Sequence, residues 1–172
     1  PLMNKLRNLS FPIVTAVNGP AAGVGMSLAL TGDIVMPSET AYFLQAFAKI
    51  GLVPDGGATW YLPRLIGWGR AMELSMLAER LPASEALSWG LVNRVVPEAE
   101  LAAASMAMAQ RLASGPKSLG LSRKAYWASW ENDFNKQMQL EADLQTEAHA
   151  SADNREGVAA FLEKRPPVFT GE

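Results

Sequence analysis

The chain has 172 residues, no cysteine and one histidine, and its formal net charge at pH 7 is −2. This length suits one globular domain with a sizeable core, and the lack of cysteine excludes disulfides and thiolate chemistry. The charge balance gives no electrostatic footprint for nucleic acid, a single histidine excludes a histidine-rich metal site, and no apolar run reaches the roughly 20 residues that a membrane span needs.

The first half of the chain alternates short apolar segments with turns. The spacing of apolar residues and the turn residues between them predict the type of each segment. In chain order we expect a helix over residues 2–9, a strand over 12–17, a helix over 25–30, strands over 33–36 and 41–44, helices after 57 and over 70–78 and 84–89, and a strand over 92–96.

The second half of the chain is predicted to be helical throughout. We expect helices over residues 101–112, 117–130, 134–149 and 153–164, the last of them capped by Asp153 with Glu156 three residues later. Strands early and helices late favour an α/β or α+β core followed by a helical portion. We place the boundary between these two regions at residues 97 and 98, which gives regions 1–97 and 98–172.

A glycine-rich turn leads into the apolar helix near residue 25. Gly23-Val24-Gly25 is followed by no Gly-Lys-Ser/Thr and by no third small residue at the spacing of a dinucleotide fingerprint. Glycines before a helix leave its first amides unpaired at the positive end of the helix dipole. An oxyanion held there gains about 3–4 kcal/mol per donor in known cases. Close packing of the helix on a sheet is the alternative explanation.

One acid stands in an apolar stretch about thirty residues later. Asp55 lies between Leu52-Val53-Pro54 and Gly56-Gly57. We expect an apolar wall to raise the pKa of Asp55 and make it a competent base near neutral pH. An ordinary turn, with the aspartate bonding its own backbone, accounts for the same residues.

Taken together, these segments resemble the crotonase family, also called the enoyl-CoA hydratase/isomerase family. The resemblance covers essentially the whole chain. The segments that carry it are residues 12–19, 23–30, 33–35, 51–57, 83–96 and 156–165.

The resemblance implies a ββα spiral core and a helical C-terminal portion that forms trimers or dimers of trimers. It implies an acyl-CoA substrate, with no cofactor besides the CoA that belongs to the substrate. From the charge pattern and the short apolar runs we expect no nucleic-acid or membrane partner. The Val24 amide would be one of two oxyanion donors. The other donor, with much of the CoA-binding half, would precede Pro1, and we expect a cytoplasmic protein.

The resemblance also assigns roles to side chains. The two acids of a hydratase would stand where this chain has Ser27 and Phe47. Asp55 stands instead where several isomerases of the family carry their acid/base. We expect Ser27, Phe47 and Trp60 to line the substrate pocket. The family's C-terminal contacts to CoA would fall on Phe161 and Lys164.

We therefore expect an acyl-CoA isomerase that forms an enolate with one aspartate as acid/base. Residues 50–60 and 140–172 resemble the branch that isomerises a ring-1,2-epoxide of phenylacetyl-CoA and also shifts double bonds from 3-enoyl- to 2-enoyl-CoA. Two alternatives stay open at this point. One is an enoyl-CoA hydratase with an acid supplied from upstream, and the other is a non-catalytic acyl-CoA-binding homologue.

Overall fold

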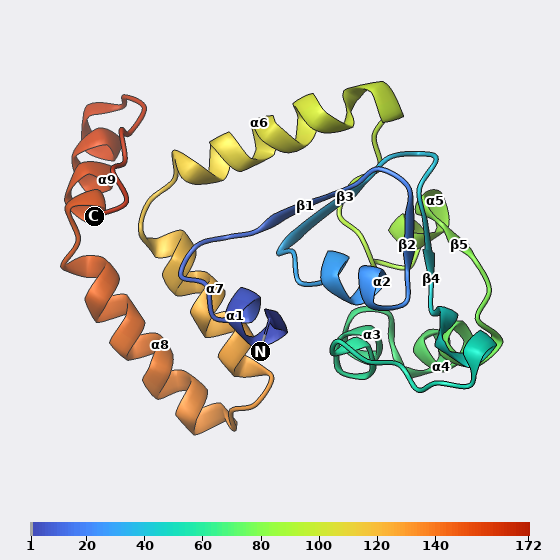
Figure 1. The fold of residues 1–172 in the computed structure, drawn as a ribbon. Helices are drawn as coiled ribbons and strands as arrows, with labels where there is room; N and C mark the ends of the chain where they lie inside the picture. The colour runs from blue at the N-terminus through green and yellow to red at the C-terminus, as the bar shows by residue number, and fades with distance from the viewer. Residues whose placement is uncertain (1) are drawn as a thin grey trace. The chain divides into compact units, whose positions relative to one another are not determined.

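The computed structural model describes residues 2–172, and the chain divides into two compact units. The first unit comprises residues 2–6 and Ile13–Met108, and the second comprises Arg7–Pro12 and Ala109–Glu172. Figure 1 labels the elements of both. The mixed helix and strand content confirms the expected fold class. Each unit is described by itself below.

The first unit is built on two small sheets. In one, β1 (Val14–Val17) pairs in parallel with β3 (Ile34–Pro37), with Val14 opposite Ile34. In the other, β4 (Tyr42–Leu44) lies between β2 (Pro20–Ala22), to which it is parallel, and β5 (Leu81–Pro82), to which it is antiparallel. Parallel pairing of β2 with β4 matters most here, because both strands end at the start of the predicted oxyanion helix.

The strand predicted over residues 92–96 is wrong. This segment makes only an isolated bridge, between Ser38 and Val96. It runs beside β3, where the Asn93 amide donates to the Val35 carbonyl at 3.0 Å. However, the Val35 amide donates to the side-chain oxygen of Asn93, at 2.7 Å, rather than to a backbone carbonyl. The side chain therefore takes the place of a ladder acceptor and ends regular pairing.

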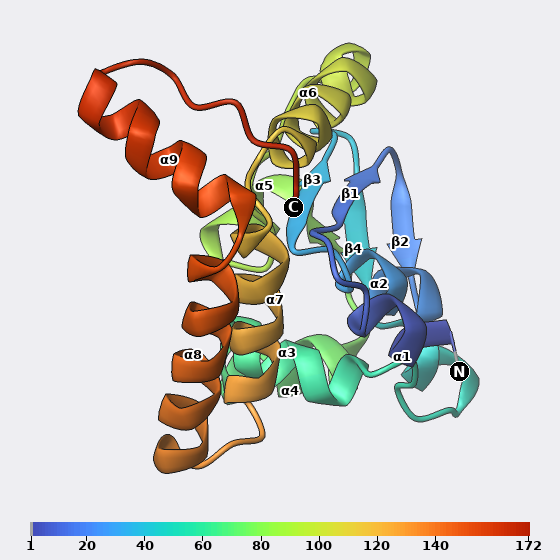
Figure 2. The ribbon, with the colours of Figure 1, turned by 90° about the vertical axis from the view of Figure 1, so that its left-hand side faces the viewer.

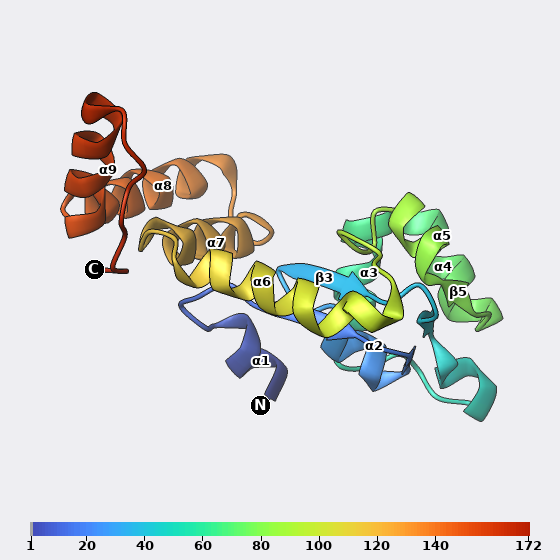
Figure 3. The same cartoon turned by 90° about the horizontal axis from the view of Figure 1, so that it is seen from above.

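Helices make up the rest of the first unit. α3 and α4 pack against each other, and α2 packs beside β2 (Figures 1 and 3). The core is formed by apolar side chains from these elements, and Met26 and Phe43 have no exposed surface. The helices are α1 (Leu2–Arg7), α2 (Val24–Ala29), the 3-10 helix η1 (Ala46–Ile50), α3 (Ala58–Ile66), α4 (Trp68–Leu77), α5 (Ala83–Ser88), the 3-10 helix η2 (Glu98–Glu100) and α6 (Leu101–Ala113), which continues into the second unit.

The second unit is helical, as the sequence predicts. α7 (Ser118–Ser129) and α8 (Phe134–His149) lie side by side, and α9 (Ala152–Glu163) follows (Figure 2). The guanidinium of Arg123 is buried and donates to the carbonyls of Arg7 and Leu9, at 2.6 and 2.7 Å. These bonds attach the segment Arg7–Pro12 to α7, which explains why a piece from the start of the chain belongs to this unit.

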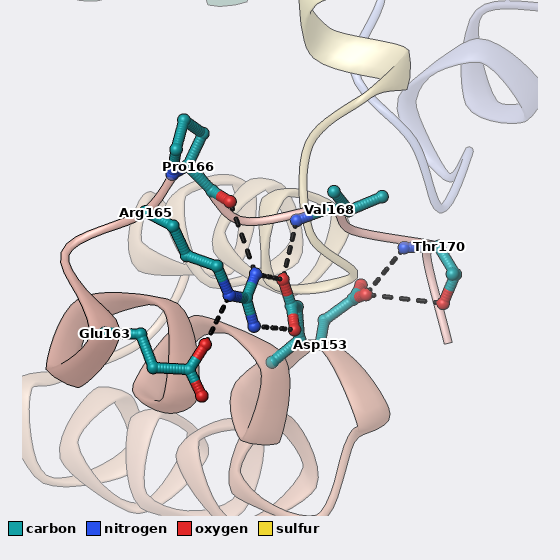
Figure 4. Close-up of polar contacts among 7 residues, drawn as sticks. Asp153, Glu163, Arg165, Pro166, Val168 and Thr170 are labelled. Carbon is teal, nitrogen blue, oxygen red and sulfur yellow. Dashed lines mark hydrogen bonds and ion pairs between the residues drawn. The ribbon is translucent and has the colours of Figure 1, made fainter.

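Asp153 does not cap α9, contrary to the prediction. The capping side chain is Ser151, which accepts from the Asn154 amide at 3.0 Å. Asp153 lies in the first turn and is 3% exposed. Its carboxylate accepts the backbone amide of Thr170 at 2.7 Å (Figure 4) and those of Gly171 and Lys117 at 3.0 and 2.8 Å. These donors, that of Thr170 first, lower the pKa of Asp153.

A second carboxylate of α9 holds the tail in the same way. Glu156 accepts two bonds from the Arg165 guanidinium, at 2.6 and 2.9 Å, and one from the Val168 amide at 2.8 Å. The Arg165 bonds, followed by that of Val168, lower the pKa of Glu156 to about 2. Arg165 also donates to Glu163 at 2.6 Å (Figure 4). The C-terminal tail is thus attached to α9 by charge-assisted hydrogen bonds.

Candidate active site

The start of α2 has the backbone geometry that an oxyanion donor needs. Gly23 precedes the helix at φ 54° and ψ −126°, a conformation that only glycine adopts readily. Its amide donates to the Leu44 carbonyl at 2.8 Å, which fixes the turn to the end of β4. Within the described residues, the Val24 amide donates to no acceptor. It is one of the unpaired donors that begin every helix, so it is available to an anion.

Asp55 lies on the tight turn between η1 and α3. Gly51, Gly56 and Gly57 all have positive φ in this region, at 71°, 61° and 90°. The Asp55 carbonyl accepts the Ala58 amide at 3.1 Å, so the turn leads directly into α3. The Asp55 side chain is exposed. Its carboxylate can therefore reach a ligand bound over this surface.

The apolar wall expected around Asp55 is not formed by its neighbours in sequence. Ile50, Leu52 and Val53 are themselves exposed, at 71%, 59% and 81% of their surface. The prediction assumed that apolar residues close in sequence pack together. The positive φ of Gly51 turns the chain after η1 instead, and these side chains point to the surface.

Ser27 lies on α2 beneath the Asp55 turn. It has no exposed surface, and its hydroxyl donates to the Asp55 backbone carbonyl at 2.9 Å. Gly56 packs against Ser27 and Val24, since a methyl group on its α-carbon would lie 2.8 Å from Ser27 Cβ and 3.4 Å from Val24 Cγ2. The turn that carries Asp55 therefore rests on the face of α2 that holds Val24 and Ser27.

Phe47 and Trp60 come from the two helices that precede and follow the Asp55 turn in sequence. Phe47, from η1, is 8% exposed, and its ring is 3.7 Å from the position that a Cβ on Gly23 would occupy. Trp60, from α3, is half-buried and packs edge-to-face on Tyr61, with ring centroids 5.3 Å apart. The guanidinium of Arg64 lies 4.5 Å from the Trp60 ring centroid. Neither aromatic side chain carries a group that could replace a hydratase acid.

An apolar groove of about 540 Å³ lies next to the Asp55 turn in the first unit. Pro54, which directly precedes Asp55, is part of its wall. The other lining residues come from η1, α3 and α4, and they are Ala48, Thr59, Leu62, Pro63, Trp68, Ala71, Met72, Ser75 and Met76. The groove next to the Asp55 turn thus offers room for an apolar group.

The predicted CoA contacts lie in the second unit. Phe161 is 83% exposed on α9. Lys164 follows the last turn of that helix with φ 54°, so it ends α9 in the left-handed conformation. Both side chains are accessible to a ligand or a partner.

The structure thus brings Val24, Ser27, Phe47 and Asp55 together around one helix start. The role of Ser27 in this arrangement could not be predicted, because its partner is 28 residues away and the bond is to a backbone atom. Among the described residues, no group of three or more histidine, cysteine, aspartate or glutamate side chains is arranged to hold a metal ion. No helix there is long and apolar enough to cross a membrane.

A glycine turn with an unpaired amide thus lies next to a second glycine turn that carries an acid. A comparison with protein families matches residues 1–172 to the family described as enoyl-CoA hydratase/isomerase. The chain belongs to this family.

Two curated relatives and one solved structure place the chain within the family. It is 47% identical to 1,2-epoxyphenylacetyl-CoA isomerase of Escherichia coli over 173 residues, covering 100% of this chain and 66% of that protein. It is 46% identical to the "Probable enoyl-CoA hydratase" of Rhodobacter capsulatus, covering 99% and 67%. The enoyl-CoA hydratase/isomerase structure from Cupriavidus metallidurans superposes with a TM-score of 0.92 at 38% identity, covering 98% and 64%. The chain therefore spans about two thirds of the length of these relatives.

Proposed function

We propose that the protein is an acyl-CoA isomerase that works through a thioester enolate, with Asp55 as its one acid/base. The Asp55 carboxylate removes a proton from C2 of a 3-enoyl thioester, and the electrons move onto the thioester oxygen. The Val24 amide donates a hydrogen bond to this oxygen as negative charge develops on it. Asp55 then returns the same proton to C4, so that the double bond ends between C2 and C3 and no atom is gained or lost.

The observation that carries this proposal is that the turn holding the exposed Asp55 packs against Val24 and Ser27 in the first turns of α2. The side chain of Ser27 is buried and bonded to backbone, and Phe47 is aromatic, so neither can activate water. Asp55 is exposed on the turn that packs against the same helix. Hydration needs one group to activate water and another to protonate carbon, whereas isomerisation needs one group that takes and returns a proton.

We propose that the substrate is a ring-1,2-epoxide of phenylacetyl-CoA, a 3-enoyl-CoA, or both. The 47% identity to the Escherichia coli isomerase over the whole chain supports this choice. We further propose that Phe161 and Lys164 contact CoA, that Trp60 borders the substrate pocket, and that the protein works in the cytoplasm as a homotrimer or a dimer of trimers. The exposure of Phe161 is compatible with such a contact.

The test uses the full-length protein, a 3-enoyl-CoA substrate and the absorbance of the conjugated thioester. Wild-type protein should form 2-enoyl-CoA, and Asp55→Asn should lower kcat by about a hundredfold or more, as expected for loss of a general acid/base. Glu73→Gln is the matched control, because it also removes one exposed carboxylate of the first unit, on α4. Equal activity of Asp55→Asn and Glu73→Gln would refute the proposal.

Hydratase activity is the second candidate, and the 46% identity to the Rhodobacter capsulatus protein favours it. The same absorbance readout with 2-enoyl-CoA as the substrate separates the two, because a hydratase consumes 2-enoyl-CoA and would do so in Asp55→Asn as well. A non-catalytic acyl-CoA-binding protein is the third. It would bind the thioester without exchanging the C2 protons for solvent deuterium.

A further inference from the structure

The Ser27 hydroxyl joins two parts of the chain that are far apart in sequence. A serine inside a helix commonly bonds a carbonyl of the preceding turn of its own helix. Ser27 donates instead to the carbonyl of Asp55, at 2.9 Å, from a side chain with no exposed surface. This bond is shielded from water, so breaking it leaves a buried acceptor with one partner fewer.

The turn that carries Asp55 has few other polar attachments. The Asp55 carbonyl also accepts the Ala58 amide, but that bond is local, since it closes the first turn of α3. Within the part of the chain that the structure describes, the backbone amides of Val53, Asp55, Gly56 and Gly57 donate to no acceptor, and Pro54 has no amide hydrogen. The Ser27 hydroxyl is thus the one described hydrogen bond that ties these five residues to α2.

Packing acts at the same point as this hydrogen bond. The missing Cβ of Gly56 leaves just enough room for Ser27, since a methyl group there would come within 2.8 Å of Ser27 Cβ. Val24 and Ser27 are three residues apart and share a face of α2. The contact of Gly56 with Ser27 therefore holds the Asp55 turn against the helix start that carries the Val24 amide.

We propose that Ser27 is a positioning residue that holds Asp55 in register with the Val24 amide. The inference rests on the proposed function of Asp55 as acid/base. It adds that the serine acts through the backbone of Asp55 rather than on the substrate. Because a shift of about 1 Å in a catalytic group can cost up to a hundredfold in rate, one buried hydroxyl is sufficient for a kinetic effect.

The kinetic test compares Ser27→Ala with wild type in the full-length protein, using the 3-enoyl-CoA assay. We expect kcat to fall about tenfold and KM to change less than twofold, because substrate contacts are kept while the acid is misplaced. Ser27→Cys keeps a weak donor in a side chain of similar shape. Its kcat should lie between those of wild type and Ser27→Ala. Thr15→Val is the matched control. It removes a hydroxyl that donates to another carbonyl of α2, that of Ala29, also at 2.9 Å, and should leave kcat unchanged.

A second measurement reads the turn without catalysis. The Ala58 amide bonds to the same Asp55 carbonyl that accepts from Ser27. In Ser27→Ala, hydrogen exchange of this amide should become about two- to tenfold faster, the range expected for loss of one hydrogen bond. It should stay unchanged in Thr15→Val.

The outcomes separate this inference from the proposed function. If kcat and Ala58 exchange are both unchanged in Ser27→Ala while Asp55→Asn is inactive, the positioning role is wrong and the acid/base role stands. If Asp55→Asn keeps full activity, the proposed function fails, whatever Ser27→Ala does. A fall in kcat that appears equally in Thr15→Val would also overturn the inference, because it would reflect general loosening of α2.

Discussion

Replacing Gly56 by alanine should destabilise the first unit through two separate effects. Gly56 has φ 61°, where an L-residue loses about 1–2 kcal/mol. The added methyl group would lie 2.8 Å from Ser27 Cβ and 3.2 Å from its Oγ, an overpacking that typically costs about 1–3 kcal/mol. The expected loss in the free energy of unfolding is therefore about 2–5 kcal/mol.

Gly51→Ala is the control that separates these effects. Gly51 also has positive φ, 71°, but a methyl group there would meet nothing within 4 Å. It should lose only the backbone part, about 1–2 kcal/mol. Denaturant unfolding followed by circular dichroism would measure both variants, and the difference between them is the contribution of the contact with Ser27.

A double variant tests whether Ser27 is the neighbour that matters. Ser27→Gly removes the Cβ against which the new methyl group would collide, so Ser27→Gly with Gly56→Ala should lose less stability than the sum of the two single variants. If Gly56→Ala is no more harmful than Gly51→Ala, or if the double variant is strictly additive, the turn does not pack on Ser27 and the argument for its position fails.

Three further outcomes concern the second unit and the first turns of two helices. Gly120→Ala, in the first turn of α7, should lower the thermal midpoint because its methyl group would overlap the Ser10 carbonyl oxygen, whereas Gly69→Ala, in the first turn of α4, meets open space and should not lower it. Asp153→Asn should free the C-terminal tail, seen as faster amide exchange and carboxypeptidase digestion, because an amide cannot accept three bonds as a carboxylate does. The folded pKa values of Asp153 and Glu156 are lowered, that of Glu156 to about 2. Their stabilisation is therefore complete above the unfolded pKa of about 4 and is lost as the pH falls through the folded pKa of each group, so the tail should stay attached at pH 5 and detach only below pH 4.

Helix positions in the second half of the chain follow closely from the sequence. The predicted helix over 134–149 has the observed bounds, Phe134–His149, and the helix predicted over 117–130 is Ser118–Ser129. Long segments with a steady apolar period and clear breakers leave little freedom, which is why they are predictable. Helix caps are less predictable. Asp153 and Ser151 are both good cap residues, and the tail amides that donate to Asp153 lie more than fifteen residues away in sequence.

Short strands depend on partners that the sequence does not reveal. β2 (Pro20–Ala22) stands in a stretch that reads as a glycine–proline turn, and it is a strand because β4 lies beside it. The segment 92–96 has the composition of a strand and is not one, because the Asn93 side chain bonds the Val35 amide. In both cases a contact distant in sequence overrides the local pattern.

The candidate site could be predicted only as a list of residues. The resemblance to the family placed roles on Val24 and Asp55, and the structure brings their segments together through Gly56. That Asp55 would be exposed was not predictable from its apolar neighbours, since a single positive φ at Gly51 redirects them. The contact that attaches the turn to α2 involves a hydroxyl and a backbone oxygen, and neither leaves a signature in the sequence.

The packing around Ser27 also bears on the proposal that this protein uses one acid where a hydratase uses two. A glutamate at this position would place four heavy atoms beyond the Cβ, at a contact where Gly56 has no room even for a methyl group of its own. The side chain is fully buried, so the added carboxylate would lose its hydration unless the turn moved away. Moving the turn would carry Asp55 with it. We therefore expect Ser27→Glu to displace the Asp55 turn from α2, whereas serine keeps the turn seated there.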